Sequence, residues 1–204
     1  MTQYIFRLAT ADDTAEIRRM QDQFIIEAHD PIGVLEGSYS RSEFLVLERR
    51  DERGSRLIGM VSLMRASAGP LALEHVFPDV WERVDLPALT GRSGIARDDL
   101  IEHDWTYVEP EHRGKRLAKA LWAGSMLVAH QRGHAALIAI SNPSIMALMR
   151  DDFRTIGLAA DVAGVHYELG MMFPEESAPR MAEIARQACA RDPGMVWRLP
   201  GLES

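Results

Sequence analysis

The hydrophobic pattern of the chain predicts strands at its start, in its middle and near its end. Segments that alternate polar with apolar positions, or that are rich in β-branched and aromatic residues, have the composition and period of strands. A continuous apolar run from Ala135 to Ile140 indicates a strand buried on both faces. The other predicted strands are Gln3 to Leu8, Phe44 to Arg49, Leu57 to Met64, Ile101 to Val108, and a pair within Asp161 to Met172 that turns at Gly164.

Helical spacing of apolar residues predicts helices between these strands. Thr10 to Asp13 supplies capping and acidic residues for a first helix, in which Ile17, Met20, Phe24 and Ile25 recur on one face. A stronger pattern covers Gly114 to Arg132, and Gly133 is a natural stop. The remaining predicted helices are Asn142 to about Phe153, opened by an N-cap residue and a proline, and Ala178 to Arg191.

Residues 66–100 have no regular pattern, although they keep apolar and aromatic side chains such as Leu71, Phe77 and Trp81. Such content is typical of a packed insertion rather than of a linker, so no domain boundary is expected there. Three antiparallel strands are followed by a strand–helix–strand crossover. Because the strands on either side of a crossover run parallel, the order of elements predicts a mixed α/β sheet.

Composition and charge narrow the possible functions. The 204 residues carry a formal net charge of −7, which opposes general nucleic-acid binding. Cys189 is the only cysteine, so neither an intrachain disulfide nor a cysteine metal cluster can form. No stretch approaches the ~20 apolar residues of a membrane span, and the first residues lack a signal-peptide pattern. We therefore expect a cytoplasmic protein that does not enter a membrane.

The densest chemistry lies where a predicted strand ends at Val108 and the next helix begins with Arg113-Gly114-Lys115-Arg116. The first amide groups of a helix have no partner within the helix and lie at the positive end of its dipole, so they attract anions. Gly114 lets the backbone approach a ligand closely. This pattern predicts a site for a phosphate-bearing ligand. The alternative is that the basic residues only solvate the end of a helix.

Three pieces of the chain resemble the GCN5-related N-acetyltransferase (GNAT) superfamily, namely FRLATADDTAEIRRM, YVEPEHRGKRLAKAL, and SNPSIMALM with IGL. The central piece follows the superfamily's V-x-P-x-x-R-G-x-x-[LI]-[GA] form, except that Arg116 stands where glycine is usual. The resemblance implies a GNAT-like fold, with a mixed, mostly antiparallel central sheet, a parallel strand pair at its centre and flanking helices. It implies a domain over 1–173, including the insertion 66–100, and a helical extension over 174–204 packed on it.

The resemblance also implies that the cofactor is acetyl-CoA or another acyl-CoA. Its pantetheine arm would pair with Tyr107 and Val108 like an added strand, where two parallel strands splay apart. Asn142 matches a position that often bonds the cofactor, and helix capping is the alternative reading. The pyrophosphate would be held by backbone amides of Arg113, Gly114, Lys115, Arg116, Leu117 and Ala118.

Acyl transfer to an amine needs a base, a polarised thioester carbonyl and a proton for the leaving thiolate. Several members of the superfamily use a glutamate at the position of Glu102 as general base. With a strand period of two, Glu102 shares a face with Asp104, Thr106 and Val108, and His103 points to the opposite face. The alternative for Glu102 is an ordinary surface or salt-bridged carboxylate. The backbone N–H of Val108 is the candidate to polarise the carbonyl.

The proton donor is open, because many relatives carry a tyrosine where this chain has Met149, and methionine donates no proton. The candidates are Tyr107, Tyr167 and water, unless the thiolate leaves unaided. The sequence Glu102-His103-Asp104 does not predict a metal site, because adjacent strand side chains diverge. We therefore expect no metal. Met60, Met64 and Met171 are candidates to line an acyl channel.

The leading hypothesis is an acyl-CoA-dependent N-acyltransferase, with acetyl-CoA as donor and a small-molecule amine as acceptor. The alternative is a long-chain synthase similar to N-acyl amino acid or acyl-homoserine lactone synthases, fed by acyl-CoA or acyl carrier protein. The long apolar insertion and Met149 favour it, whereas the first helix lacks the arginine–tryptophan pattern of lactone synthases. A second alternative is a non-catalytic module that binds acyl-CoA. Edge strands also suggest a homodimer.

Overall fold

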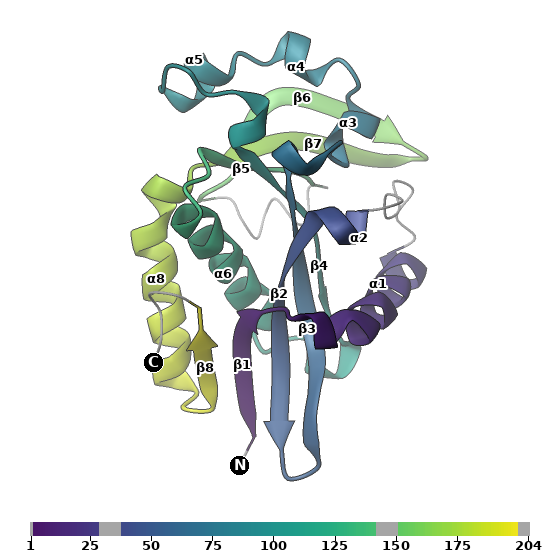
Figure 1. The fold of residues 1–204 in the computed structure, drawn as a ribbon, viewed down its shortest axis with the longest axis vertical. Helices are drawn as coiled ribbons and strands as arrows, with labels where there is room; N and C mark the ends of the chain where they lie inside the picture. Colours follow the sequence, from purple (N-terminus) through teal and green to yellow (C-terminus); the bar gives the residue numbers. More distant parts are fainter. Residues whose placement is uncertain (1, 29–37, 142–150, 200–204) are drawn as a thin grey trace.

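A computed structural model of the chain describes residues 2–28, 38–141 and 151–199. Its core is one eight-stranded sheet with the order β6-β7-β5-β4-β3-β2-β1-β8 (Figure 1). Neighbouring strands run antiparallel, except that β4 pairs with β5 and β1 pairs with β8 in parallel. The strands are β1 (Gln3–Leu8), β2 (Ser42–Asp51), β3 (Gly54–Arg65), β4 (Leu100–Val108), β5 (Ala136–Ser141), β6 (Arg154–Val162), β7 (Val165–Met172) and β8 (Met195–Arg198).

Helices cover both faces of this sheet. On one face, α6 (Leu117–Gln131) and α8 (Pro174–Arg191) pack against each other, and α1 (Thr14–Ala28) lies on the other face (Figure 1). The two faces bury separate apolar clusters, because alternate residues of each strand point to opposite sides. Gly124 allows α6 to approach β2 closely, since a Cβ there would lie 2.5 Å from Leu45 Cδ2.

The fold class predicted from the sequence is confirmed, and the mixed sheet with its parallel crossover pair has the expected arrangement. Three details differ. The helix expected from Gly114 begins at Leu117, Ile25 is 38% exposed rather than buried, and β8 was not predicted at all. Most of the helix expected from Asn142 lies outside the described residues, and Phe153, its expected end, is not helical.

A β-bulge in β4 overturns one prediction about the site. Trp105 pairs with Ser62, whereas the next residue of β3, Leu63, pairs with His103, so Asp104 is an extra residue in β4. The bulge reverses the alternation of side chains. Val108 lies in the cluster beneath α6, and Trp105 and Tyr107 lie in the cluster beneath α1. The prediction that Glu102 shares a face with Val108 was therefore wrong, because a strict period of two does not hold across a bulge.

The insertion at residues 66–100 is packed against the sheet, as the sequence predicted. Its elements are η2 (Ala66–Ala68), α3 (Leu73–Val76), α4 (Val80–Arg83), α5 (Leu86–Thr90) and η3 (Arg97–Asp99). Buried residues of the insertion, including Leu71, Phe77 and Val80, form a cluster with residues of β5 and β7. This packing places the insertion over the β5–β7 end of the sheet, where α3 to α5 form a cap (Figure 1).

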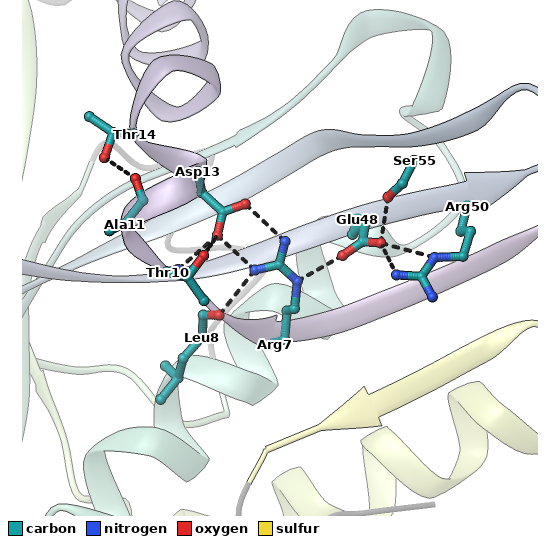
Figure 2. A network of polar contacts seen from close by, with 9 residues as sticks. All are labelled: Arg7, Leu8, Thr10, Ala11, Asp13, Thr14, Glu48, Arg50 and Ser55. Atoms are coloured by element: carbon teal, nitrogen blue, oxygen red, sulfur yellow. Dashed lines mark hydrogen bonds and ion pairs between the residues drawn. The ribbon is translucent and has the colours of Figure 1, made fainter.

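A network of charged residues fixes the start of α1 on the sheet (Figure 2). Arg7 of β1 donates to both carboxylate oxygens of Asp13, at 2.8 and 2.9 Å, and to Glu48 of β2 at 2.7 Å. Thr10 donates through its backbone and its hydroxyl to Asp13, which completes the cap of η1 (Ala11–Asp13). The position of α1 over the sheet therefore depends on one guanidinium shared by two carboxylates.

Of the helices that the structure describes, none has both the length and the apolar character needed to cross a lipid bilayer.

Candidate cofactor and acyl-transfer site

The connection between β4 and α6 has the geometry of an anion-binding turn. After the short helix η4 (Pro110–His112), Arg113 is extended, Gly114 has φ of +81° and Arg116 has φ of +62°. Arg113 N donates to Pro110 O, and Ala120 N donates to Arg116 O. Between these bonds, the described structure gives no backbone acceptor to the amides from Gly114 to Lys119, and α6 has no side-chain N-cap. This end of the helix is open to a ligand.

Arg116 adopts the left-handed conformation that glycine normally supplies at this position of the resembling motif. For a residue with a Cβ this conformation costs about 1–2 kcal/mol. The turn therefore keeps the shape expected of glycine while carrying an additional positive charge. At Gly114 a Cβ would meet no atom within 4 Å, so a substitution there is resisted by the backbone conformation and not by lack of space.

Beside this turn, the parallel strands β4 and β5 separate. They pair only from Leu100 to Glu102 of β4, opposite Ala136 to Ile138 of β5. Glu109 N donates to Ile58 O of β3 at 2.8 Å, so the peptide groups of Val108 point away from β3, toward the side where β5 has splayed apart. Arg113 Nε already donates to Val108 O at 2.8 Å. The N–H of Val108 therefore faces the notch, and its carbonyl is held by the turn.

Tyr107, on the opposite face of β4, contacts a carboxylate that the sequence gave no reason to select. Tyr107 Oη donates to Glu27 Oε1 of α1 at 3.1 Å, and Arg113 Nη2 donates to Glu27 Oε2 at 2.5 Å. The guanidinium also lies over the Tyr107 ring, 5.6 Å from its centroid. Burial and the hydrogen bond to Glu27 raise the pKa of Tyr107 to about 12, and Arg113 lowers the pKa of Glu27. Tyr107 thus stays protonated at neutral pH.

Glu102 is fully buried and holds the insertion in place. Its two carboxylate oxygens accept hydrogen bonds from the backbone N–H groups of Ala72, at 2.6 Å, and Leu73, at 2.9 Å. Burial raises the pKa of Glu102 well above its ordinary value, and the nearby Asp104 adds to the shift, whereas the two amides oppose it. Each oxygen keeps a second lone pair for a proton or a water molecule.

His103 lies on the α6 face, as the sequence predicted. Its Nδ1 is 3.3 Å from Ser125 Oγ of α6, and its Nε2 is 2.7 Å from Thr106 Oγ1. Because Ser125 donates to Trp122 O, its oxygen is left to accept from His103 Nδ1–H, and Nε2 accepts from Thr106. Burial lowers the pKa of His103 to about 3, so the ring is neutral. The contact joins residues on both sides of the bulge.

One group of side chains has ligand atoms close enough to hold a metal ion. Atoms of Glu109, Glu111 and His112 lie within 4.8 Å of one another. Arg56 Nη2 lies among them, 3.0 Å from Glu109 Oε2, 2.9 Å from Glu111 Oε1 and 3.5 Å from His112 Nε2. The guanidinium therefore already supplies a positive charge there. His112, expected to be a solvated loop residue, is only 5% exposed, and burial lowers its pKa.

The structure brings together some of the residues singled out in the sequence and separates others. Tyr107, Val108 and the residues from Arg113 to Ala118 gather around the β4–α6 turn. Glu102 lies further along β4, because at about 3.3 Å per residue the two strand positions are far apart. Asn142 and Met149 fall outside the described residues. Glu27 was missed because its contacts link residues 80 and 86 positions apart in the chain, which no local pattern reveals.

Sequence comparisons identify no relative. A scan against protein-family models finds no match, and a search of curated proteins finds none either.

Solved structures match most of the chain. BjaI, a CoA-dependent acyl-homoserine lactone synthase seen with SAM and isopentyl-CoA, has a TM-score of 0.62 at 18% identity, over 90% of this chain and 89% of its own. FeeM, an N-acyl amino acid synthase from uncultured soil microbes, has a TM-score of 0.61 at 15% identity, over 87% and 99%. An N-acetyltransferase from Staphylococcus aureus Mu50 has a TM-score of 0.53 at 16% identity, over 84% and 98%. The chain therefore has the GNAT-like fold of these acyltransferases.

Proposed function

We propose that this protein is an acyl-CoA-dependent N-acyltransferase that acts on a small-molecule amine. The observation that carries the proposal is the open start of α6, where the amides from Gly114 to Lys119 have no backbone acceptor in the described structure. Lys115, Arg116 and Lys119 add positive charge to this open end. The adjacent notch between β4 and β5 offers a strand edge to a pantetheine arm. One ligand that carries both a diphosphate and an amide-containing arm fits both features.

The names of similar structures support the same class of reaction. BjaI is a CoA-dependent acyl-homoserine lactone synthase, and FeeM is an N-acyl amino acid synthase. We carry over from them the acyl donor and the amine acceptor as classes, and leave the particular acyl chain and amine to experiment.

The packing of methionines favours a short acyl group. Met60, Met64 and Met171, the candidates for an acyl channel, are all fully buried in apolar clusters. A long chain would have to displace them, whereas an acetyl group would not. The long-chain alternative rests on BjaI and FeeM and on the flexibility of methionine, whose unbranched side chain repacks readily. Acyl carrier protein would then be a possible donor.

A bound acyl-CoA supplies a thioester carbonyl as electrophile and a thiolate as leaving group. The N–H of Val108 faces the notch and is positioned to polarise that carbonyl. The attacking amine forms the amide C–N bond while the C–S bond breaks, and it loses one proton. Glu102 is the proposed acceptor of this proton through a water molecule, which its remaining lone pairs can bind.

The sulfur takes up a proton as it leaves, and Tyr107 is the proposed donor. Because its pKa is raised to about 12, Tyr107 is a weak acid whose main contribution is a hydrogen bond to the developing thiolate. Water then completes the protonation. Asn142 stays a proposed contact to the cofactor.

Release of free thiol tests the proposal directly. The purified protein is incubated with acetyl-, octanoyl- or palmitoyl-CoA and a panel of small amines. Turnover of acetyl-CoA is the expected result, and preference for a long chain would favour the synthase alternative. Tight binding of acyl-CoA without thiol release under any pairing would contradict the enzyme proposal and leave a binding module.

A further inference from the structure

A pocket of about 400 Å³ lies beside the open start of α6, between that helix and α8. Its walls come from segments that are distant in sequence, because β8 pairs with β1 and thereby holds the end of α8 next to the turn. A second, shallow hollow is lined by Gly114, Lys115, Arg116 and Arg191. Arg191, near the end of α8, thus faces the same turn that we propose binds the diphosphate.

The pocket is strongly basic in a protein whose net charge is −7. Lys115, Arg116, Lys119 and Arg191 line it, and in the described part of the chain the structure records no ion pair for any of them. Lys115 lies over the Tyr4 ring and donates to its hydroxyl at 3.3 Å. The one acidic residue in the lining, Asp192, accepts a hydrogen bond from Gly194 N. The positive charges therefore lack a carboxylate partner.

The lining is apolar between these charges. Hydrophobic residues from α6, α8 and β8 form this part of the surface, namely Leu117, Ala120, Ile184, Ala188 and Met195. A concave site with an apolar surface and convergent cations suits a planar base that carries a phosphate. It does not suit a flat acidic helix, which would contact the rim and leave the pocket empty.

We propose that this pocket binds the 3′-phosphorylated adenosine end of the CoA donor, with Arg191 contacting the 3′-phosphate. The inference rests on the proposed function, since it assigns a second part of the same ligand to a second part of the same site. It gives α8 and β8 a role in donor selection, because the extension supplies Arg191 to a turn that the core of the fold already contains. A donor without the 3′-phosphate would lose that contact.

Calorimetric titration of the full chain with CoA and with 3′-dephospho-CoA tests the proposal, since the two ligands differ only in the 3′-phosphate. We expect the wild-type protein to bind CoA at least about tenfold more tightly, as a charge-assisted contact provides. Arg191→Gln is expected to remove most of this preference and to leave the affinity for 3′-dephospho-CoA within about twofold. The matched control is Arg186→Gln, because Arg186 lies on the same helix, pairs with Glu183 and does not line the pocket.

The other outcomes separate this inference from the proposed function. Equal affinity of the wild-type protein for both ligands would overturn the inference and leave the proposed function standing. An equal loss of affinity for both ligands in Arg191→Gln would also overturn it, because it would show that Arg191 only maintains the fold. Loss of acyl carrier protein binding in Arg191→Gln, with the preference for CoA unchanged, would assign the pocket to the carrier protein instead. Failure to bind either nucleotide would overturn the inference and the proposed function together.

Discussion

Glu27 of α1 and Arg113 of the β4–α6 turn form an ion pair with a distance of 2.5 Å between Oε2 and Nη2. The pair links the helix on one face of the sheet to the turn proposed to hold the diphosphate. Because Arg113 also donates to Val108 O, its guanidinium is engaged by the protein before a ligand arrives. A diphosphate that recruits this side chain must compete with Glu27.

Removal of this competition should strengthen CoA binding. In Glu27→Gln, Arg113 loses its charged partner, and we expect the dissociation constant of CoA to fall about two- to fivefold, as is usual for an exposed ion pair. Calorimetric titration measures the change. Glu16→Gln is the matched control on the same helix, since Glu16 pairs with Arg19 and not with the turn. Weaker CoA binding in Glu27→Gln alone would show that Glu27 supports the ligand and does not compete with it.

Glu102 should contribute to both stability and turnover. In Glu102→Gln, the amide NH₂ group would face one of the two backbone N–H donors at Ala72 and Leu73. Leaving that donor unsatisfied should lower the free energy of unfolding by about 2 kcal/mol. As the proposed base, Glu102 should also be needed for turnover but not for CoA affinity. Denaturant unfolding and steady-state kinetics measure the two effects, and a turnover equal to that of the wild type would exclude the role as base.

The stability effect of Glu102 should also depend on pH. Its pKa is raised in the folded protein, so the native state holds the proton at pH values where the unfolded chain has lost it. The wild-type protein should therefore gain stability relative to Glu102→Gln as pH falls from above the raised pKa toward 4.5, the ordinary value. A stability difference that does not change over this range would contradict the assignment.

The Arg7 network should make the fold sensitive to acid. The pKa values of Asp13 and Glu48 are lowered to about 2, in Asp13 chiefly by the Arg7 hydrogen bond and in Glu48 by hydrogen bonds from Ser55 and Arg7 that outweigh the effect of burial. Their contribution is present above the unfolded values of 3.8 and 4.5 and is lost as pH falls toward 2. Unfolding monitored by circular dichroism between pH 5 and 2 should show this loss (pH range about that of the titrations).

The same network gives a mutational test. Arg7→Met leaves two carboxylates without their shared partner and should cost about 3 kcal/mol, whereas Arg50→Met, at the exposed end of the network, should cost less than about 1 kcal/mol. Chemical denaturation of the two variants compares them. Equal costs would show that the contact between β1 and the start of α1 is not what the network stabilises.

Arg116 offers a test of backbone strain in the turn. Glycine adopts the left-handed conformation without penalty, so Arg116→Gly should raise the free energy of unfolding by about 0.5 kcal/mol after its greater unfolded-state entropy is subtracted. Arg116→Ala removes the same charge but keeps the strain, and it should give no such gain. If the two variants have equal stability, the turn does not hold this residue in a strained conformation.

The sequence predicted the sheet well because its signals are local. The apolar run of β5, the alternation in β2 and β3 and the glycine turn at Gly164 each act over a few residues, and each element formed where expected. The bulge at Asp104 left no such signal, since it depends on how β4 pairs with β3. For that reason the face of Glu102 was misassigned. The four-residue strand β8 was missed because its strand character comes from pairing with β1.

The site could be predicted only in part, for a similar reason. The motif around Arg113 and Gly114 marks a strand-to-helix turn within one continuous segment, and that turn is present. Glu27 and Arg191 reach the turn from other parts of the chain, so their positions follow from the packing of α1 and α8. Local patterns locate a turn, whereas the side chains that surround it depend on tertiary structure.

The central claim is that the backbone amides after Arg113 bind a diphosphate, and a crystal structure of the protein soaked with CoA tests it most directly. We expect pyrophosphate oxygens within about 3.2 Å of amide nitrogens between Gly114 and Ala118, with the pantetheine arm alongside Val108. CoA bound elsewhere on the protein, or those nitrogens occupied by acceptors from the chain itself, would contradict the claim.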